Sequence, residues 1–192
     1  MTTNIKFAKV RPDAKIPSKR DEDMGFDIYA CFDEDYIVIE PHETKLIPTG
    51  IASACDSDYG FVLRERGSTG SKGIALRAGV IDSGYRNEWF VGLTNTGKKT
   101  VCITKLPREE IVLKYTEMMT TLQKFGNEFA KKCYEEMMWR DASEFVLYPY
   151  EKAIAQALVI PVPKTVVEEV SYEELQNIKS ERGLGALGSS GK

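Results

Sequence analysis

Short apolar runs alternate with turn-forming residues through the first hundred residues of the chain. The runs are rich in β-branched and aromatic residues, and Gly, Pro, Asp and Asn separate them. They read IKFAKV, DYIVIE, TKLIPTG, FVLRE, EWFVGLTN and TVCITK. Segments of this length and composition, so closely spaced, are typical of strands. The sequence therefore predicts an all-β barrel or sandwich.

The pattern changes after Leu106-Pro107. From there to about residue 140 the apolar residues recur every three or four positions, which is the helical period. Strand-like runs return as EFVLYPY and AIAQALVIPVP, and a short acidic helix and a glycine-rich tail follow. We therefore expect a discontinuous β domain at 1–106 and 147–178, a helical insertion at 107–146 and a flexible C-terminal arm at 179–192.

Charge and composition exclude several classes of function. The 192 residues carry a net charge of −3, so the chain has no basic field for general nucleic-acid binding. No apolar run is long enough for a membrane span, and MTTNIKFAKV lacks a signal-peptide core, so we expect a cytoplasmic protein. The four Cys form no CxxC pair and His42 is the single histidine, which excludes zinc ribbons and two-histidine mechanisms.

Two features suggest chemistry on phosphates, although each also has an ordinary explanation. The loop at 66–72 combines Gly, Ser and Thr with Arg66 and Lys72, the donors that wrap a polyphosphate. Gly/Ser turns with a Lys are also common as plain turns. Asp82 ends a short apolar strand, where its carboxylate could act as a general base for water or only cap a turn.

Five ordered motifs resemble those of the homotrimeric dUTP pyrophosphatase (dUTPase) family. They are GFDIYA (25–30), RGSTGSK (66–72), GVIDSGY (79–85), AIAQALVIPV (153–162) and RGLGALGSSG (182–191). Five motifs in order are much more specific than any one of them. The resemblance implies a jelly-roll-like β-clip domain, assembled as a homotrimer whose active sites are shared between subunits. It also implies Mg²⁺-assisted attack of water on the α-phosphorus of dUTP, giving dUMP and pyrophosphate.

The resemblance assigns roles to individual residues. Asp82 would activate the water, and Tyr85 would lie under the deoxyribose and exclude a ribose hydroxyl. Arg66 and Ser68 would face the phosphates, Gln156 would hold the α-phosphate or the water, and Arg182 would bind the γ-phosphate. Asp27 would support the water shell of the metal. Further substrate contacts are implied for Gly67, Thr69, Gly79, Ile81, Leu187, Ser189 and Ser190.

The motifs also depart from the family pattern. The second motif usually reads Arg-Ser-Gly, whereas this chain has Arg66-Gly67-Ser68. Leu187 stands in place of a Phe that stacks on uracil, and it cannot stack as an aromatic ring does. Asn87 occupies a usual Gly, and Lys152 stands one residue early for the basic position of the fourth motif.

Other functions stay open at this point. The fold could serve a catalytically weak regulatory module that binds a protein partner through residues 107–146, as some phage dUTPases do. The insertion would suit a phage or prophage protein. A dCTP deaminase, a relative with the same fold, is a further alternative. It would need a glutamate base, and GVIDSGY with Tyr85 favours the dUTPase.

Overall fold

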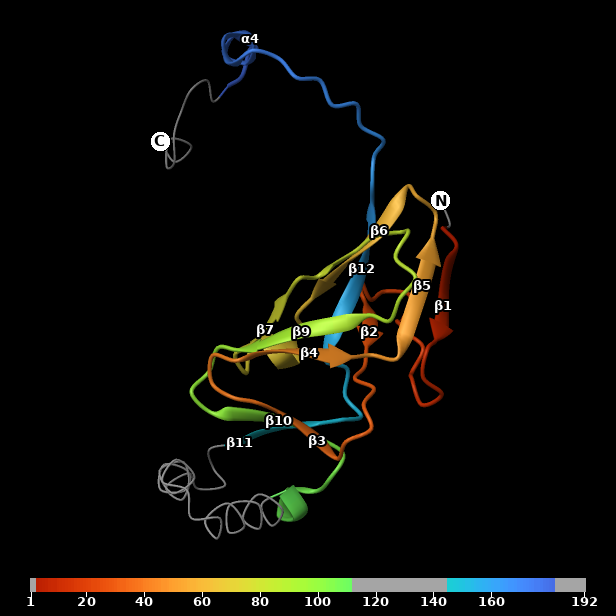
Figure 1. The fold of residues 1–192 in the computed structure, drawn as a ribbon, viewed down its shortest axis with the longest axis vertical. Coiled ribbons are helices and arrows are strands. Elements are labelled where there is room, and N and C mark those ends of the chain that lie inside the picture. The colour runs from red at the N-terminus through yellow and green to blue at the C-terminus, as the bar shows by residue number, and fades with distance from the viewer. Residues whose placement is uncertain (1–2, 112–144, 182–192) are drawn as a thin grey trace. The chain divides into compact units, whose positions relative to one another are not determined.

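The computed structural model describes residues 3–111 and 145–181, and within them strands dominate (Figure 1). The strands are β1 (Ile5–Lys9), β2 (Phe26–Ile28), β3 (Tyr36–Ile39), β4 (Thr44–Pro48), β5 (Ile51–Cys55), β6 (Tyr59–Arg64), β7 (Ile74–Arg77), β8 (Val80–Ile81), β9 (Phe90–Asn95), β10 (Thr100–Thr104), β11 (Phe145–Pro149) and β12 (Ala155–Pro161). The helices are α1 (Gly67–Gly70) and α4 (Tyr172–Asn177). The expected mainly β fold is confirmed.

The described strands pair into four small sheets. Their orders are β1-β5, β11-β10-β3, β2-β12-β6-β8 and β4-β9-β7. Neighbouring strands are antiparallel except β10 and β11, which run parallel. Most neighbours are far apart in the chain, so the sheets depend on long-range pairing.

The parallel pair β10–β11 explains why a long connection lies between them. Parallel neighbours need a crossover that returns the chain to the starting end. The chain enters this connection in a helical turn at 108–111, where the Ile111 amide donates to the Pro107 carbonyl at 3.2 Å. Residues 112–144 lie outside the described part, so the expected helical insertion and its partner surface stay predictions.

One hydrophobic core joins the sheets of the first unit, which runs to Val162. Its largest side chains include Trp89, Phe61 and Tyr148, all fully buried. The Trp89 ring meets the rings of Phe7 and Phe61 edge-on, with centroids 5.7 and 5.0 Å apart. Because Phe7 comes from β1 and Phe61 from β6, this cluster ties two sheets together.

The turn between β4 and β5 is a tight junction of the fold. Gly50 has a φ of 68°, and a Cβ there would lie 2.8 Å from the Ala14 Cβ and 2.9 Å from the Cys31 Sγ. Its amide donates to the Glu88 Oε1 at 2.8 Å, and its carbonyl accepts from the Val10 amide at 2.7 Å. Only glycine meets both the conformational and the spatial demand.

A second unit begins at Pro163 and contains α4. The Ser171 hydroxyl accepts a hydrogen bond from the Glu174 amide at 3.1 Å, which caps the start of the helix. Glu173 and Glu174 lie in its first turn, where carboxylates favour a helix. The short acidic helix expected here is therefore present. The expected boundary between the β domain and the C-terminal arm, at 178/179, stays a prediction.

Among the described helices, none combines the length and apolar character needed to cross a bilayer.

We predict that Gly50→Ala destabilises the protein by about 2–4 kcal/mol, because a left-handed conformation costs about 1–2 kcal/mol and overpacking about as much again. Gly84→Ala is the matched control, since a Cβ at Gly84 meets nothing within 4 Å. Equilibrium denaturation at one protein concentration measures both. Equal stabilities for the two variants would show that the junction at Gly50 is not tight.

Candidate active site

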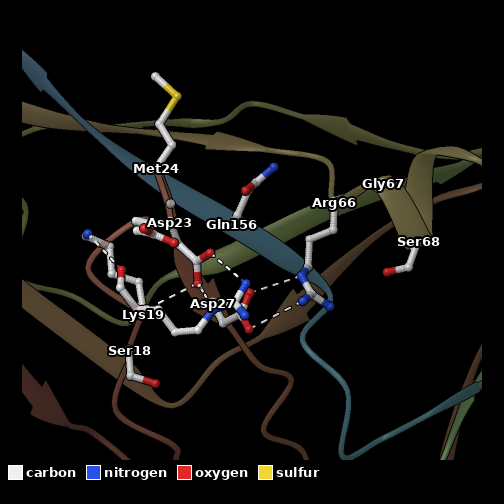
Figure 2. A pocket seen from close by; sticks show the side chains of 12 residues that line it. Ser18, Lys19, Asp23, Met24, Asp27, Arg66, Gly67, Ser68 and Gln156 are labelled. Carbon is white, nitrogen blue, oxygen red and sulfur yellow. Dashed lines mark hydrogen bonds and ion pairs between the residues drawn. The ribbon is translucent and has the colours of Figure 1, made fainter.

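A cavity of about 790 Å³ opens beside the end of β6 (Figure 2). Two chain segments and two strands provide its walls. They contribute Ser18, Lys19, Arg20, Glu22, Asp23, Met24, Gly25, Asp27, Arg66, Gly67, Ser68 and Gln156. Residues from the first, second and fourth motifs thus share one cavity.

The register of three strands brings Asp27 and Gln156 together. Gln156 on β12 pairs with Asp27 on β2 and with Arg64 on β6. Directly paired residues point to the same face of a sheet. Gly25 allows the close approach of Gln156, because a Cβ at Gly25 would lie 2.9 Å from the Gln156 Oε1.

The Arg66 side chain extends toward Asp27, and both line the cavity. Its Nε lies 3.0 Å from the Asp27 Oδ1, and its Nη2 donates to the Asp27 Oδ2 at 3.4 Å. Its Nη1 donates to the Ala153 carbonyl at 3.3 Å. The two side chains of the ion pair are 31% and 34% exposed, so solvent reaches them only in part. Figure 2 shows Arg66 and Asp27 facing each other across the cavity.

Thr69 supports the loop that carries Arg66. Its hydroxyl accepts from the Arg66 amide and donates to the Arg66 carbonyl, each at 3.0 Å, and the residue is buried. This hydroxyl is thus engaged inside the loop, and the substrate contact expected for Thr69 stays a prediction. Gly67 and Ser68 lie exposed at the rim.

Glu65 connects this loop to its surroundings. Its carbonyl accepts from the Gln156 Nε2 at 2.7 Å, and its Oε1 accepts from the Leu76 amide at 2.9 Å. The hydrogen bond from the Leu76 amide is the main cause that lowers the pKa of the Glu65 carboxyl. A hydrogen bond from the backbone amide of Glu65 itself lowers this pKa further. Glu65 therefore holds both the Gln156 side chain and the β7 strand.

The segment 18–25 forms the opposite wall, which sequence reasoning did not include in the site. The Asp27 amide donates to the Ser18 carbonyl at 2.9 Å, anchoring the segment to β2. Arg20 makes two 2.9 Å bonds to Asp23, and these bonds lower the pKa of Asp23 to about 2. The charged run directly before GFDIYA was the available signal.

The Gly79–Tyr85 hairpin runs antiparallel to β6, from Leu63 toward Gly60. The Leu63 amide donates to the Gly79 carbonyl at 2.6 Å, and a Cβ at Gly79 would lie 2.7 Å from the Leu63 carbonyl oxygen. Ile81 is buried opposite Phe61. Close backbone approach therefore requires glycine at position 79.

Asp82 and Tyr85 project from the exposed turn of this hairpin. The Tyr85 amide donates to the Asp82 carbonyl at 3.1 Å, and the Tyr85 hydroxyl donates to the Glu88 carbonyl at 3.0 Å. Asn87 keeps a negative φ, because only His42 and Ala78 have positive φ among the described non-glycine residues. The usual glycine at position 87 is thus not required by this backbone.

The hairpin and the cavity are separated within one chain. The β6–β8 ladder pairs Phe61 with Ile81, so Asp82 follows at the Gly60 end of β6. From Gly60 to Arg66 the chain advances six residues, which is about 20 Å in a strand. The structure therefore does not bring Asp82 and Tyr85 to the cavity of the same chain.

The residues expected from the fifth motif are Arg182, Leu187, Ser189 and Ser190, and they lie outside the described residues.

Comparisons with known proteins indicate one family. A model of the dUTPase family matches residues 13–114. A deoxyuridine 5'-triphosphate nucleotidohydrolase of Leptospira interrogans is 35% identical over 99 residues, covering 50% of this chain and 68% of the relative. Its counterpart in Nautilia profundicola is 30% identical over 192 residues, covering 98% of this chain and 99% of the relative.

A solved structure has a similar fold over the whole chain. The dUTPase of Staphylococcus bacteriophage 80alpha with bound dUPNHPP superposes with a TM-score of 0.65. Each chain is covered to 100%, at 18% sequence identity. At this identity the likeness shows the fold alone.

We predict that Glu65→Ala lowers the free energy of unfolding by about 1–2 kcal/mol, because it leaves the Leu76 amide without its acceptor. Glu65→Gln is the control, since a side-chain amide oxygen can accept the same bond. It should retain most of the stability in equilibrium denaturation. If both variants matched the unsubstituted protein, the Glu65 bond would contribute nothing to holding the loop.

Proposed function

Because the chain belongs to the dUTPase family, we propose that it hydrolyses dUTP to dUMP and pyrophosphate. One observation supports the proposal at the level of individual residues. Asp27, Arg66 and Gln156, which come from three separate motifs, line one cavity. Phosphoryl chemistry depends on positioning and charge stabilisation more than on a nucleophilic side chain, and this donor set suits it.

Asp82 is the general base of the proposed reaction. Its carboxylate lies on an exposed turn. The hydrogen bond from the Tyr85 amide to the Asp82 carbonyl closes this turn. A carboxylate held in this way can accept a proton from water as the water attacks the α-phosphorus. The bond from phosphorus to the bridging oxygen breaks, and pyrophosphate leaves.

The same hairpin selects the nucleoside. The bond from the Tyr85 hydroxyl to Glu88 holds the ring in place. A ring fixed under the sugar leaves no space for a ribose 2′-hydroxyl. The backbone from Gly79 to Tyr85, with Ile81 anchored in the core, reads the edge of uracil. Cytosine presents an amino group where uracil has an oxygen, so it meets the wrong partner.

The cavity receives the phosphates. Arg66 supplies the cation, and the Ser68 hydroxyl and the Gly67 amide supply further donors at the rim. Gln156 lies beside Asp27 and contacts the α-phosphate or the attacking water. The tail residues Arg182, Leu187, Ser189 and Ser190 complete the contacts when the tail closes over the nucleotide.

The donor set fits Mg²⁺ that arrives on the triphosphate. No group of three or more His, Cys, Asp or Glu residues in the described part of the chain could hold a metal ion alone. Mg²⁺ in nucleotide sites usually keeps several waters and is bound by phosphates with one or two carboxylates. Asp27 in the cavity provides such a carboxylate. When bound, the ion neutralises the charge that develops on the phosphates.

A complete site requires more than one copy of the chain. The roughly 20 Å between Asp82 and the cavity along β6 is too long for both to reach one phosphorus. A homotrimer in which the hairpin of one subunit faces the cavity of another removes this separation.

The proposed function predicts a definite substrate choice. With Mg²⁺ the protein should release pyrophosphate from dUTP and much less from dCTP, dTTP and UTP. Asp82→Asn should lower kcat by about 10²–10⁴-fold, the usual contribution of a general base. Quantifying pyrophosphate release for the four nucleotides with both proteins tests this. Equal rates for the two proteins would remove Asp82 from the mechanism. Release of ammonia from dCTP, without pyrophosphate release from dUTP, would favour the deaminase alternative.

The altered order Arg66-Gly67-Ser68 in the second motif can be tested by substitution. Gly67 faces open space, because an added Cβ would meet nothing within 4 Å. Gly67→Ser should therefore fold normally and place a hydroxyl beside Arg66, lowering KM for dUTP by about 2–10-fold through one further hydrogen bond. Ser68→Ala is the complementary variant and should raise KM. An unchanged KM in both would show that neither hydroxyl position touches the substrate.

A further inference from the structure

The Arg66 guanidinium has a second anchor besides Asp27. Its Nη1 donates to the Ala153 carbonyl at 3.3 Å, shortly before β12 begins. Asp27 contacts Nε and Nη2, so each contact uses a different nitrogen. A guanidinium has five N–H groups, and these contacts within the described part of the chain leave one on each terminal nitrogen for phosphate oxygens. The Ala153 carbonyl therefore helps to decide where the phosphate-facing edge of Arg66 points.

The Ala153 carbonyl is held in place by two further hydrogen bonds. Its oxygen accepts from the Tyr148 hydroxyl at 2.6 Å, in a buried bond. The amide of the same peptide unit belongs to Ile154, and it donates to the Ile28 carbonyl on β2 at 2.8 Å. The peptide unit is thus bonded at both ends, once to β2 and once to β11. A carbonyl oxygen has two lone pairs, and Tyr148 and Arg66 share those of Ala153.

Tyr148 is itself tightly constrained. The residue is 1% exposed and lies on β11, which is paired with β10. The Lys72 ammonium lies 5.3 Å from the centroid of the Tyr148 ring, in a cation–π contact. The turn after β11 is closed by the Lys152 amide, which donates to the Pro149 carbonyl at 3.0 Å. The Tyr148 hydroxyl therefore donates to Ala153 from a fixed position.

We propose that Tyr148 is a positioning residue that acts through the Ala153 carbonyl to orient Arg66 toward the phosphates of the substrate. The inference rests on the proposed function, which places phosphates against Arg66, and deepens it. The other partner of the guanidinium, the Asp27 carboxylate, is 34% exposed. An acceptor fixed in the interior limits the rotation of the guanidinium, so less conformational freedom is lost when a phosphate binds.

A simpler role for the Tyr148 hydroxyl is structural. A buried hydroxyl needs an acceptor, and the Ala153 carbonyl provides one whether or not Arg66 is present. In that case loss of the hydroxyl lowers stability and leaves the affinity for phosphates unchanged, or changes it equally with and without the guanidinium. A double-mutant cycle between positions 148 and 66 separates the two roles.

The experiment measures binding to the full chain by isothermal titration calorimetry in Mg²⁺. The probes are a dUTP analogue with an imido group in place of the scissile bridging oxygen, and inorganic triphosphate. Tyr148→Phe removes the hydroxyl and keeps the ring. We expect it to raise Kd for both probes by about 3–10-fold, the usual effect of one hydrogen bond.

The second arm of the cycle repeats this substitution in the Arg66→Lys background. Lysine keeps the positive charge, so binding stays measurable, but its side chain ends one atom short of the Nη1 that reaches Ala153. In this background Tyr148→Phe should change Kd by less than about twofold, because the group through which Tyr148 acts is gone.

Tyr150→Phe is the matched control. It removes a hydroxyl from the same short segment, and that hydroxyl interacts with Cys31 and the Phe32 backbone. It should leave Kd within about twofold of the wild-type value. Thermal melting verifies that the variants fold. In addition, p-aminophenylalanine at position 148 keeps the ring with a weaker donor. It should recover part of the affinity, and it takes the place of Phe in the cycle if Tyr148→Phe does not fold.

An unchanged Kd in the folded Tyr148 variant would overturn the inference. An equal rise in the Arg66→Lys background or in Tyr150→Phe would overturn it too, as would failure of the wild-type protein to bind either probe. Absence of dUTP turnover is a separate outcome. If the Kd for inorganic triphosphate still rose in Tyr148→Phe and not in the Arg66→Lys background, the proposed function would be overturned and Tyr148 would remain the residue that orients Arg66 toward an anion.

Discussion

The register of β12 between β2 and β6 is the constraint on which the site depends. Gln156 is paired with Asp27 on one side and Arg64 on the other. A slip of one residue would send Gln156 into the core and bring Ala155 or Ala157 to the cavity, since strand side chains alternate between faces. Ala155 and Ala157 are fully buried, so the core itself holds the register. The position of Gln156 at the cavity is therefore set by packing on the far face of the same strand.

The loops of the site are held mainly by hydrogen bonds between side chains and backbone groups. Thr69 closes the Arg66 loop, Glu65 joins it to β7, and Glu88 accepts from the Gly50 amide beyond the Asp82 hairpin. Arg86 adds a bond to the Ser53 carbonyl at 3.2 Å. Each of these residues immobilises a backbone segment while leaving neighbouring side chains exposed. A site built in this way is rigid where it must position groups and open where it must admit a ligand.

Much of this could be predicted from the sequence. Alternating β-branched runs located most strands, because their faces differ in burial. The strands β2, β5 and β7 were harder, since they are extended mainly through pairing with distant partners. The cavity residues Asp27, Arg66 and Gln156 followed from motif resemblance. The wall at 18–25 did not, because Lys19, Arg20 and Asp23 are typical of a solvated loop in sequence. Nor could sequence reveal that the Thr69 hydroxyl is used internally, which depends on a turn geometry that Gly and Ser residues do not specify.

The separation of Asp82 from the cavity and the pairing of Arg66 with Asp27 have a common consequence. One isolated chain presents a base without phosphate donors at one end of β6 and a charge-neutral cavity at the other. Under the proposed function, the hairpin of a second subunit supplies the missing base, and the cation on the substrate supplies the missing charge. Activity then requires the assembly of subunits together with a substrate that carries a cation.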